Sequence, residues 1–169
     1  NYMYPYNKEV PENKDEFIKV NTNNESCIDN IDIYLKIEDD TIKKIYFDEI
    51  DSTNDYAISR DEPSDFAVIA KRQTGGKGTK GRSFSSELGG AYLTLVKYYP
   101  LKAENSFKIM ASSCLAVAKT LGVYGINASV KWANDVLAGG KKICGILIKN
   151  SFEGEYVKKS VIGIGVNLN

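Results

Sequence analysis

Hydrophobic and polar positions alternate along several parts of the chain, whereas one longer part follows a helical period. Residues 31–37 place Ile or Leu at every second position, which is the period of a half-buried strand. Between about residues 104 and 121 the apolar positions instead recur at steps of three and four, and Gly122 is a natural stop. The pattern therefore predicts strands and at least one long helix in the same chain.

Short apolar runs bounded by turn residues predict further strands. We expect them at residues 42–47, 66–70, 91–98, 128–131, 136–138, 143–148 and 157–166. Gly139-Gly140 and Glu153-Gly154 are typical of hairpin turns. Ser52 or Thr53 would cap a short helix that ends near Arg60.

Because strands dominate, we expect an α+β fold: a mixed, mostly antiparallel sheet with helices packed on one face. Residues 1–41 are mostly polar and would form an N-terminal extension, partly strand. Residues 42–169 would form the main domain.

The charge balance narrows the classes of function. The 22 Lys and Arg equal the 22 Asp and Glu, so no overall field favours nucleic acid or an anionic membrane as partner. No run approaches the roughly 20 apolar residues of a membrane-spanning helix, and no signal-peptide pattern opens the chain. Three widely separated cysteines suggest neither a zinc knuckle nor a disulfide framework, which favours the reducing cytoplasm.

Histidine is absent from the chain. This excludes the Ser-His-Asp triad, the Cys-His pair and the HExxH zinc site, and no side-chain cluster for a metal ion is visible. Any chemistry must use lysine, arginine, carboxylates, hydroxyls and backbone amides. Such groups suit charge neutralisation and the positioning of substrates.

A glycine-rich basic loop follows the expected strand at residues 66–70. Residues 73–82 contain four glycines, which let the backbone approach a ligand, and three cations, which would neutralise phosphate. The loop matches neither the Walker A nor the Rossmann pattern. Taken alone, it fits a solvent-exposed connection equally well.

Five segments, in this order, resemble the motifs of biotin–protein ligases. They are Asp51-Ser52-Thr53-Asn54, the loop from Gly76 to Arg82, Lys131-Trp132-Ala133-Asn134-Asp135-Val136, Lys142-Ile143-Cys144-Gly145-Ile146-Leu147 and the stretch from Gly163 to Asn169. The last three resemble the KWPND, KxxGIL and GxGxN segments of that family. Each motif alone is weak, but their order over about residues 42–169 argues against chance.

The resemblance implies a class II synthetase-like catalytic domain with two reaction steps. Biotin and Mg²⁺-ATP would give biotinyl-5′-AMP and pyrophosphate, and a lysine of a biotin carboxyl carrier protein or carboxylase domain would then attack the mixed anhydride. Two anionic reactants must be held in line, so cations and backbone N–H groups are the main requirement. A homodimer is compatible with the resemblance.

Roles carried over by position place one group of residues at biotin. These are Ser52, Thr53, Asn54, Gln73, Lys77, Gly78, Thr79, Lys142 and Gly145. Ser52 to Asn54 and Gln73 would lie near the ureido group, although Ser52 is also a plain helix cap and one hydroxyl can serve both purposes. Gly145 would leave room for the ring of biotin, and Cys144 is interpreted as a small buried hydrophobe.

A second, overlapping group would bind the nucleotide. It comprises Lys77, Gly78, Thr79, Arg82, Phe84, Lys131, Trp132, Asn134 and Asn167. The family usually has arginine at the Lys77 position and often at Thr79, so this chain would hold phosphate with fewer hydrogen bonds. Phe84 stands where the family usually has tryptophan. Trp132 would be an adenine partner or, more simply, a core residue.

Three residues are the catalytic candidates. Lys142 would lie at the biotin carboxylate and the α-phosphate, where charge builds up during adenylation. Lys77 would contact phosphate, and Asp135 would assist the second step or hold Mg²⁺. The structural alternatives are a solvated lysine after a turn and a turn-stabilising aspartate.

Other functions stay open. A lipoate–protein ligase shares the fold and the acyl-adenylate chemistry, but its RRxSGGG-type segment is absent here. A non-catalytic biotin-binding module, such as a sensor or repressor, is another alternative, but residues 1–41 lack the pattern of a helix-turn-helix, which disfavours DNA binding. Family members continue past the GxGxN strand into further helices and a small β-barrel, so we expect poor turnover from a chain that stops at Asn169.

Overall fold

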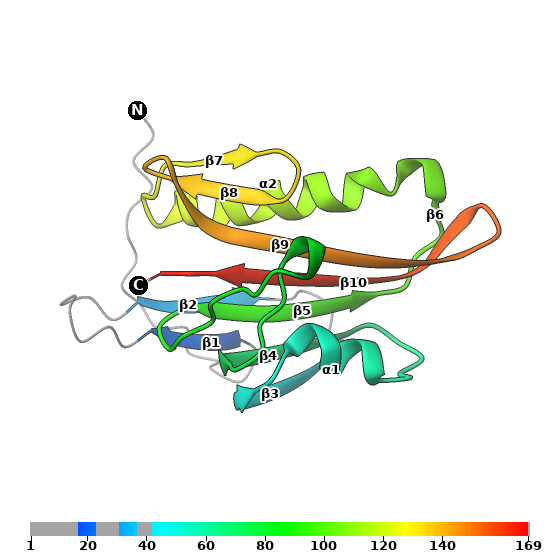
Figure 1. Cartoon of the computed structure of the whole chain (residues 1–169), viewed down its shortest axis with the longest axis horizontal. Helices are drawn as coiled ribbons and strands as arrows, with labels where there is room; N and C mark the ends of the chain where they lie inside the picture. Colours follow the sequence, from blue (N-terminus) through cyan, green and yellow to red (C-terminus); the bar gives the residue numbers. More distant parts are fainter. Residues whose placement is uncertain (1–16, 23–30, 37–41, 169) are drawn as a thin grey trace.

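The computed structural model describes residues 17–22, 31–36 and 42–168. In chain order the elements are β1 (Phe17–Thr22), β2 (Ile31–Lys36), β3 (Lys43–Ile50), α1 (Thr53–Ser59), β4 (Phe66–Gln73), η2 (Thr79–Gly81), β5 (Ala91–Lys97), β6 (Leu101–Lys102), η3 (Ala103–Asn105), α2 (Phe107–Val123), β7 (Ala128–Lys131), β8 (Asp135–Ala138), β9 (Lys141–Glu153) and β10 (Tyr156–Val166). Figure 1 shows the strands side by side, with β9 and β10 running the length of the molecule.

Eight strands form one sheet in the order β3-β4-β5-β10-β9-β8-β7, with β6 paired to β10 beside this path. Only β3 and β4 pair in parallel, and the remaining pairs of this sheet are antiparallel. The expected mixed, mostly antiparallel sheet is therefore confirmed. β1 and β2 form a separate two-stranded antiparallel sheet.

The two α-helices lie on opposite faces of the large sheet, so the expectation that they share one face is wrong. Ile162 of β10 belongs to a core that includes Ile109 of α2. Its neighbour Val161 belongs to a second core that includes Ala57 of α1. Consecutive strand residues point to opposite faces, so the two cores are separated by the sheet. A helical period reveals an apolar stripe but not which face of a sheet will cover it.

The predicted long helix is confirmed, with a modified start. Residues 103–105 form the 3₁₀ turn η3, and α2 follows as Phe107–Val123. The combined segment Ala103–Val123 is long and apolar enough by composition to cross a membrane, with a mean hydropathy of 1.2 over an 18-residue window, although no such run was expected from the sequence. Core helices meet the same criterion, and α2 buries Ile109, Cys114 and Leu121 against the sheet.

Most predicted strands are confirmed, and several are longer than their apolar runs. β9 has 13 residues and β10 has 11, because both continue into the hairpin that joins them at Gly154. β1 and β6 were not predicted. The alternating segment at residues 31–37 is confirmed as β2. Elsewhere in the predicted N-terminal extension, residues 1–16, 23–30 and 37–41 lie outside the described residues.

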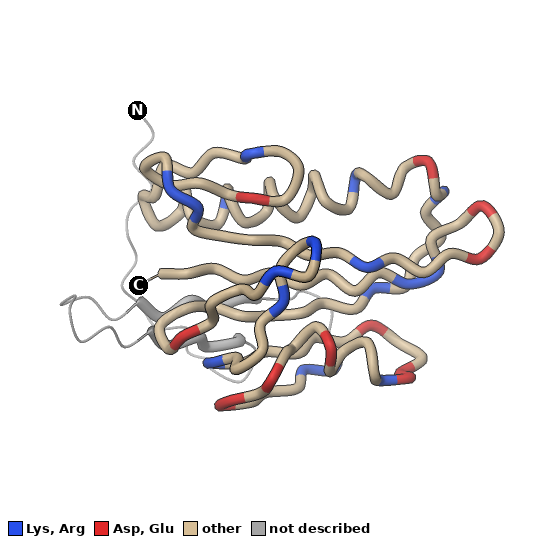
Figure 2. The backbone as a smooth tube through the Cα atoms, viewed as in Figure 1, with Lys and Arg blue, Asp and Glu red and all other residues tan. Residues whose placement is uncertain are grey.

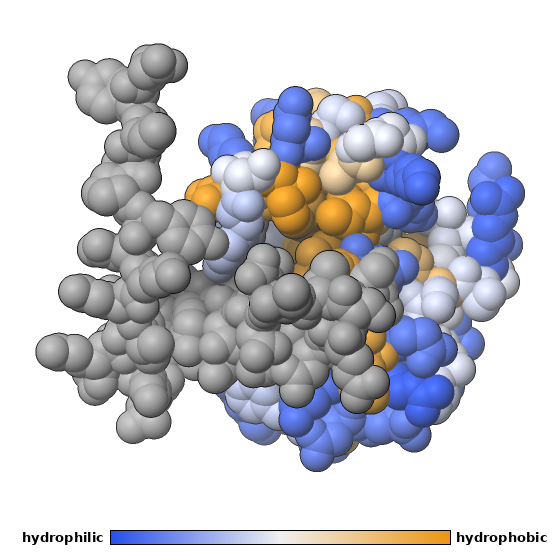
Figure 3. All heavy atoms as spheres, turned by 90° about the vertical axis from the view of Figure 1, so that its left-hand side faces the viewer, coloured by the Kyte–Doolittle hydropathy of each residue, from blue (hydrophilic) through white to orange (hydrophobic). Residues whose placement is uncertain are grey.

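Apolar side chains reach the surface at one end of the molecule. Figure 3 views this end and shows hydrophobic residues gathered between hydrophilic ones. Partly buried residues that pack against the α2 core include Ile126, Ile143 and Leu168. The α1 face is different, because its centre is hollowed by the cavity described next.

Candidate active site

A cavity opens on the α1 face of the sheet, where segments far apart in the sequence meet. Its wall is formed by the start of α1, the end of β4, the glycine-rich loop and the central strands β5, β9 and β10. The lining residues are Ser52, Thr53, Asn54, Gln73, Lys77, Gly78, Thr79, Phe84, Leu93, Thr94, Asn134, Lys142, Gly145, Ile146, Leu147, Gly163, Ile164 and Gly165. Every residue predicted to bind biotin is among them.

The first turn of α1 is fixed by side-chain hydrogen bonds. Ser52 caps the helix by accepting a bond of 3.2 Å from the backbone N–H of Asp55, which confirms its predicted capping. The Thr53 hydroxyl donates to Gln73 Oε1 at 2.9 Å and accepts from the Thr94 hydroxyl at 3.0 Å. All three predicted residues of this turn are buried, and all three line the cavity.

Asn54 carries a buried amide that the described residues leave without a partner. Its side chain is 5% exposed, and neither Nδ2 nor Oδ1 has a hydrogen bond within the described part of the chain. The side chain lies over Gly163 of β10, where a Cβ atom would come within 2.7 Å of Nδ2. A buried amide without partners costs free energy, and this one lines the cavity, where a polar ligand would satisfy it.

The glycine-rich loop folds back on itself as a hairpin-like lobe. Its neck is the backbone bond from Gln73 N to Ser86 O, 3.0 Å long. Further bonds join Phe84 N to Gly76 O at 2.8 Å and Gly78 N to Arg82 O at 2.6 Å. Figure 2 shows the basic positions of this lobe in front of the central strands, whereas acidic positions gather around β3 and α1. The loop is thus an ordered wall of the site.

Phe84 spans the floor of the cavity. A Cβ atom at Gly165 would lie 2.5 Å from its ring, and one at Gly145 would lie 2.9 Å away. The Nζ atom of Lys142 is 5.8 Å from the ring centroid, within cation–π range. Glycine at these two positions of β9 and β10 therefore makes room for an aromatic side chain from the loop.

Two lysines bring positive charge to the cavity, and each already has a carboxylate partner. Lys142 Nζ is 2.7 Å from Asp135 Oδ1. That oxygen accepts no hydrogen bond from the described residues, so the contact is an ion pair. Lys77 Nζ is 3.6 Å from Asp55 Oδ2 of α1. An anionic ligand that binds these lysines must compete with or rearrange both pairs.

A β-bulge directs Lys142 into the cavity. β8 pairs Asp135 with Gly145 and Val136 with Cys144, but Leu137 pairs with Lys142. The extra residue places Lys142 on the same face as Gly145, where its Nζ would be 3.2 Å from a Cβ at that glycine. The register also sets Asp135 beside Gly145, which explains the short ion pair.

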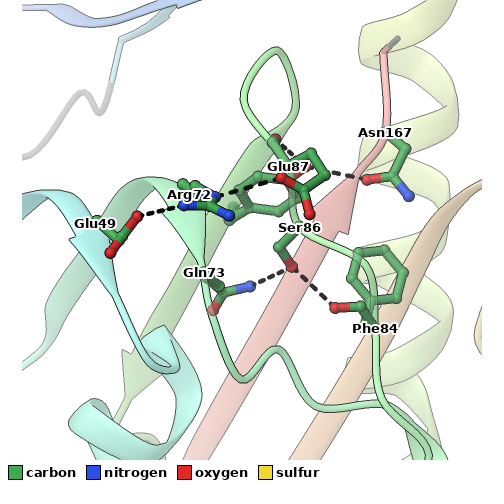
Figure 4. A network of polar contacts seen from close by, with 8 residues as sticks. Glu49, Arg72, Gln73, Phe84, Ser86, Glu87 and Asn167 are labelled. Atoms are coloured by element: carbon green, nitrogen blue, oxygen red, sulfur yellow. Dashed lines mark hydrogen bonds and ion pairs between the residues drawn. The ribbon is translucent and has the colours of Figure 1, made fainter.

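Five predicted residues do not line the cavity. Asp135 lies beside two lining residues, Lys142 and Gly145, but does not itself line the cavity. Arg82 and Lys131 are exposed, and Trp132 is 62% exposed, so the interpretation of Trp132 as a core residue is wrong. Asn167 accepts a bond of 3.2 Å from the Tyr92 hydroxyl, beside the lobe (Figure 4).

Several residues that shape the site were not predicted from the sequence. Ser86 and Thr94 are fully buried hydroxyls within the network around Gln73. Gly163 and Gly165 were noticed only as parts of a motif. Their spacing of two in a strand places both on one face, which was a usable signal for a hollow there. Nothing in the sequence distinguishes Ser86 from its neighbour Ser85.

Cys144 behaves as the predicted small hydrophobe. It is fully buried, and burial raises the pKa of its thiol to about 12. Burial likewise raises the pKa of the Cys114 thiol. Neither sulfur is a thiolate near neutral pH, so neither is an activated nucleophile.

Comparison with known proteins identifies relatives of this chain. Residues 46–167 match the model of the biotin/lipoate A/B protein ligase family. The bifunctional ligase/repressor BirA of Bacillus subtilis is 32% identical over 130 residues, which are 74% of this chain and 40% of that protein. The biotin–[acetyl-CoA-carboxylase] ligase of Paracoccus denitrificans is 35% identical over 60% of this chain and 43% of its own length.

Solved structures agree with the sequence relatives. The biotin acetyl coenzyme A carboxylase synthetase of Helicobacter pylori, with bound biotinylated ATP, has a TM-score of 0.63 and 26% identity over 76% of this chain and 62% of that one. The biotin protein ligase of Leishmania major in complex with biotinyl-5-AMP has a TM-score of 0.54 and 30% identity, over 76% of this chain and 57% of its own. This chain therefore spans less than two thirds of the length of each relative described, and it belongs to the biotin/lipoate A/B protein ligase family.

Proposed function

We propose that the protein carrying this chain is a biotin–protein ligase. In the first step an oxygen of the biotin carboxylate attacks the α-phosphorus of ATP, and the bond to pyrophosphate breaks. In the second step a lysine amine of the acceptor attacks the acyl carbon, and AMP leaves. Three of the relatives named above, those of Paracoccus denitrificans, Helicobacter pylori and Leishmania major, have names or bound ligands that specify biotin, which supports this reaction over lipoate transfer.

The observation that carries the proposal is the combination of an unpartnered buried amide and two lysines in one cavity. The cavity offers the unpartnered Asn54 amide beside the hydroxyls of Ser52 and Thr53, and Lys77 and Lys142 also line it. Biotin carries the matching groups, a ureido group that both donates and accepts and a carboxylate that would pair with a lysine. Its bicyclic ring would lie against the small residues Gly145 and Gly163.

Lys142 is the proposed catalytic cation. It would release Asp135 and bind the carboxylate and the α-phosphate, where negative charge builds up in the transition state. Lys77, Gly78 and Thr79 would line the phosphate side, with Arg82, Lys131, Asn134 and Asn167 nearer the rest of the nucleotide and Trp132 at its adenine. Phe84 would cover the bound adenylate and limit the access of water.

Mg²⁺ is proposed to arrive with ATP. No group of three or more acidic, cysteine or histidine side chains in the described residues forms a metal site by itself. Magnesium usually needs only one or two carboxylates because phosphate oxygens and water supply its other ligands. Asp135 fits that requirement once Lys142 has turned to the substrate, and it would otherwise help the acceptor amine lose its proton.

The lobe must move for a ligand to enter. The free volume inside the cavity is about 40 Å³, whereas sites for small molecules typically measure about 300–1,000 Å³. The tip of the lobe around Lys80 is exposed, whereas its neck at Ser86 is buried. We therefore propose that the tip and the Phe84 ring shift outward while the neck stays in place.

The same proposal extends to the acceptor, the compartment, the oligomeric state and the domain bounds. The acceptor would be a biotin carboxyl carrier protein or carboxylase domain, reached without nucleic acid or membrane, and the compartment would be the cytoplasm. A homodimer is compatible. Residues 42–169 would belong to the catalytic domain and residues 1–41 to an extension, in which the described segments form β1 and β2.

Biotin-dependent exchange of labelled pyrophosphate into ATP tests the first step directly. We expect exchange with biotin, none without it, and little with lipoate at the same concentration. Absence of exchange in the intact protein, or a preference for lipoate, would overturn the proposal. Transfer of biotin to a carboxyl carrier domain, followed by mass spectrometry, tests the second step.

A further inference from the structure

Four side chains and one backbone carbonyl form a continuous chain of hydrogen bonds beneath the lobe. The Thr94 hydroxyl donates to the Thr53 hydroxyl at 3.0 Å, which donates to Gln73 Oε1 at 2.9 Å. On the other side of the same carboxamide, Gln73 Nε2 donates to the Ser86 hydroxyl at 2.8 Å, and Ser86 donates to the carbonyl oxygen of Phe84 at 3.2 Å. Figure 4 shows Ser86 between Gln73 and Phe84.

Each group in this series of hydrogen bonds has a consistent role as donor or acceptor. Thr53 and Ser86 must both accept one bond and donate one, which a hydroxyl can do. Gln73 Oε1 also accepts the backbone N–H of Thr53 at 2.8 Å. Three of the four hydrogen-bonding positions of the Gln73 carboxamide are thus used inside the protein. Only one N–H of this side chain is left for a ligand.

These hydrogen bonds connect parts of the site that belong to different elements. Thr94 belongs to β5, Thr53 to α1 and Gln73 to the end of β4. Ser86 lies on the return strand of the lobe, and Phe84 covers the floor at Gly145 and Gly165. The position of the Phe84 ring is therefore linked to the middle of the sheet through hydrogen bonds as well as through the backbone.

Ser86 is the buried link in this arrangement. It is 2% exposed, and its hydroxyl holds both Gln73 and Phe84. A Cβ atom at Gly76 would lie 2.6 Å from the Ser86 oxygen and 2.4 Å from the Phe84 carbonyl, so the opposite strand of the lobe crosses directly over it. Without the hydroxyl, the partly buried N–H of Gln73 and carbonyl of Phe84 would lose their partner, which the lobe would relieve by opening.

We propose that Ser86 is a positioning residue, which holds the neck of the lobe so that Phe84 and the loop are preset around the ligand. The proposal rests on the ligase function above. Ser86 itself acts through Gln73 and Phe84 and needs no contact with biotin or ATP. Because the tip and the Phe84 ring must shift outward for entry and close again over the bound ligand, a fixed neck raises the fraction of complexes that are closed, and its loss should weaken apparent affinity while leaving turnover at saturation.

The test compares Ser86→Ala with Ser85→Ala in the intact protein, since Ser85 is exposed and adjacent. For Ser86→Ala we expect the KM for biotin to rise on the order of tenfold, with kcat within about threefold, as a reduced fraction of competent molecules requires. Ser85→Ala should match the wild type. Equal KM values for all three proteins, or a loss confined to kcat, would refute the positioning role.

A second measurement does not depend on the enzymatic activity. Hydrogen exchange at the Gly78 and Phe84 amides, which are bonded across the lobe, should accelerate in Ser86→Ala and not in Ser85→Ala. Faster exchange throughout the sheet together with a lower Tm would assign Ser86 a general structural role and overturn the proposal. If the wild type shows no biotin-dependent exchange, the ligase proposal fails, whereas the amide result still tests the lobe.

Thr94→Val provides a variant at the far end of the chain of bonds. Valine keeps the shape of threonine but cannot donate to Thr53, so the chain loses its first link. We expect a smaller rise of the KM for biotin, and a combined effect with Ser86→Ala below the product of the separate effects, because both act through Gln73. Independent, multiplying effects would contradict the linkage, and should Ser86→Ala fail to fold, Thr94→Val decides by the same two measurements.

Discussion

Lys142 is paired with Asp135 and is the residue whose substitution should reduce the reaction rate most directly. Lys142→Ala takes away the cation proposed to stabilise charge on the carboxylate and α-phosphate. Loss of a preorganised electrostatic donor typically costs about 10²-fold or more in rate, so we expect biotin-dependent pyrophosphate exchange to fall by at least ~10²-fold. The assay is the initial rate of exchange at saturating biotin and ATP.

Lys141 provides the matched control for that experiment. It is the preceding residue of β9 and is exposed, so Lys141→Ala removes the same charge from the same strand without touching the cavity. We expect its exchange rate to stay near that of the wild type, and circular dichroism should show both variants folded. A Lys142→Ala variant as fast as Lys141→Ala would remove Lys142 from the catalytic residues.

Gly163 makes room for the buried amide of Asn54, and this close approach predicts the effect of a single methyl group. A Cβ atom there would lie 2.7 Å from Nδ2, so Gly163→Ala must displace Asn54. Overpacking a tight site costs about 1–3 kcal/mol, and the displaced amide would meet the ureido group poorly. We expect biotin affinity by calorimetry to fall on the order of tenfold or more, which corresponds to about 1.4 kcal/mol. Unchanged affinity would exclude Asn54 from the ureido site.

At the scale of elements, strand periodicity predicted where most strands lie but not where their side chains point. In β9 a strict alternation would place Lys142 on the same face as Cys144, inside the α2 core. The bulge opposite Leu137 turns it to the other face instead. A bulge depends on the pairing with a neighbouring strand, so only the family resemblance, and not the period, placed Lys142 in the site.

The helices also show that periodicity does not predict how an element is placed on the sheet. The period of α2 predicted its apolar stripe correctly, and Ile109, Cys114 and Leu121 are buried. The period could not predict that α1 lies on the opposite face of the sheet. This helix is only seven residues long, and the strands around it determine on which side it packs. Ser52 was predictable as the cap because that signal is local.

Gly122 in the last turn of α2 predicts a stabilising change that is independent of the site. A Cβ atom at Gly122 would meet nothing within 4 Å, and glycine in a helix is less favourable than alanine by roughly 0.5–1 kcal/mol. We expect Gly122→Ala to raise Tm by roughly 2 °C, given the usual relation between stability and Tm for a domain of this size. Differential scanning calorimetry measures the shift, and the KM for biotin should stay unchanged. A lower Tm would mean that Gly122 has a packing role.

At the scale of the whole molecule, the cavity depends on a strand order that the sequence does not display. β5 and β10 are neighbours in the sheet, with Thr94 directly opposite Gly163, although they are far apart in the chain. Periodicity describes each strand alone, so it could not predict this pairing or the network through Ser86. The five motifs, taken together, predicted many but not all residues of the cavity, because the resemblance carries the strand order with it.

The buried core also predicts how stability should depend on pH. Burial raises the pKa of Cys144 from 9.0 to about 12 and that of Tyr92 from 10.0 to about 12, with a further contribution from Glu87 at Tyr92. A group whose pKa is higher in the folded protein loses its proton first in the unfolded chain. The stability it contributes is complete below the unfolded pKa and is lost as pH rises through the folded one.

We therefore expect the free energy of unfolding to be level up to about pH 8 and to fall from about pH 9 upward, with the thiols acting first. Each unit of pKa difference is worth about 1.4 kcal/mol once both states have titrated. Urea unfolding at pH 8, 9 and 10 tests this, with Cys144→Ala as the comparison. The variant should start less stable because it leaves a small cavity, but its stability should fall less between pH 8 and 10. An equal slope in both proteins would show that the buried thiol does not govern the alkaline loss.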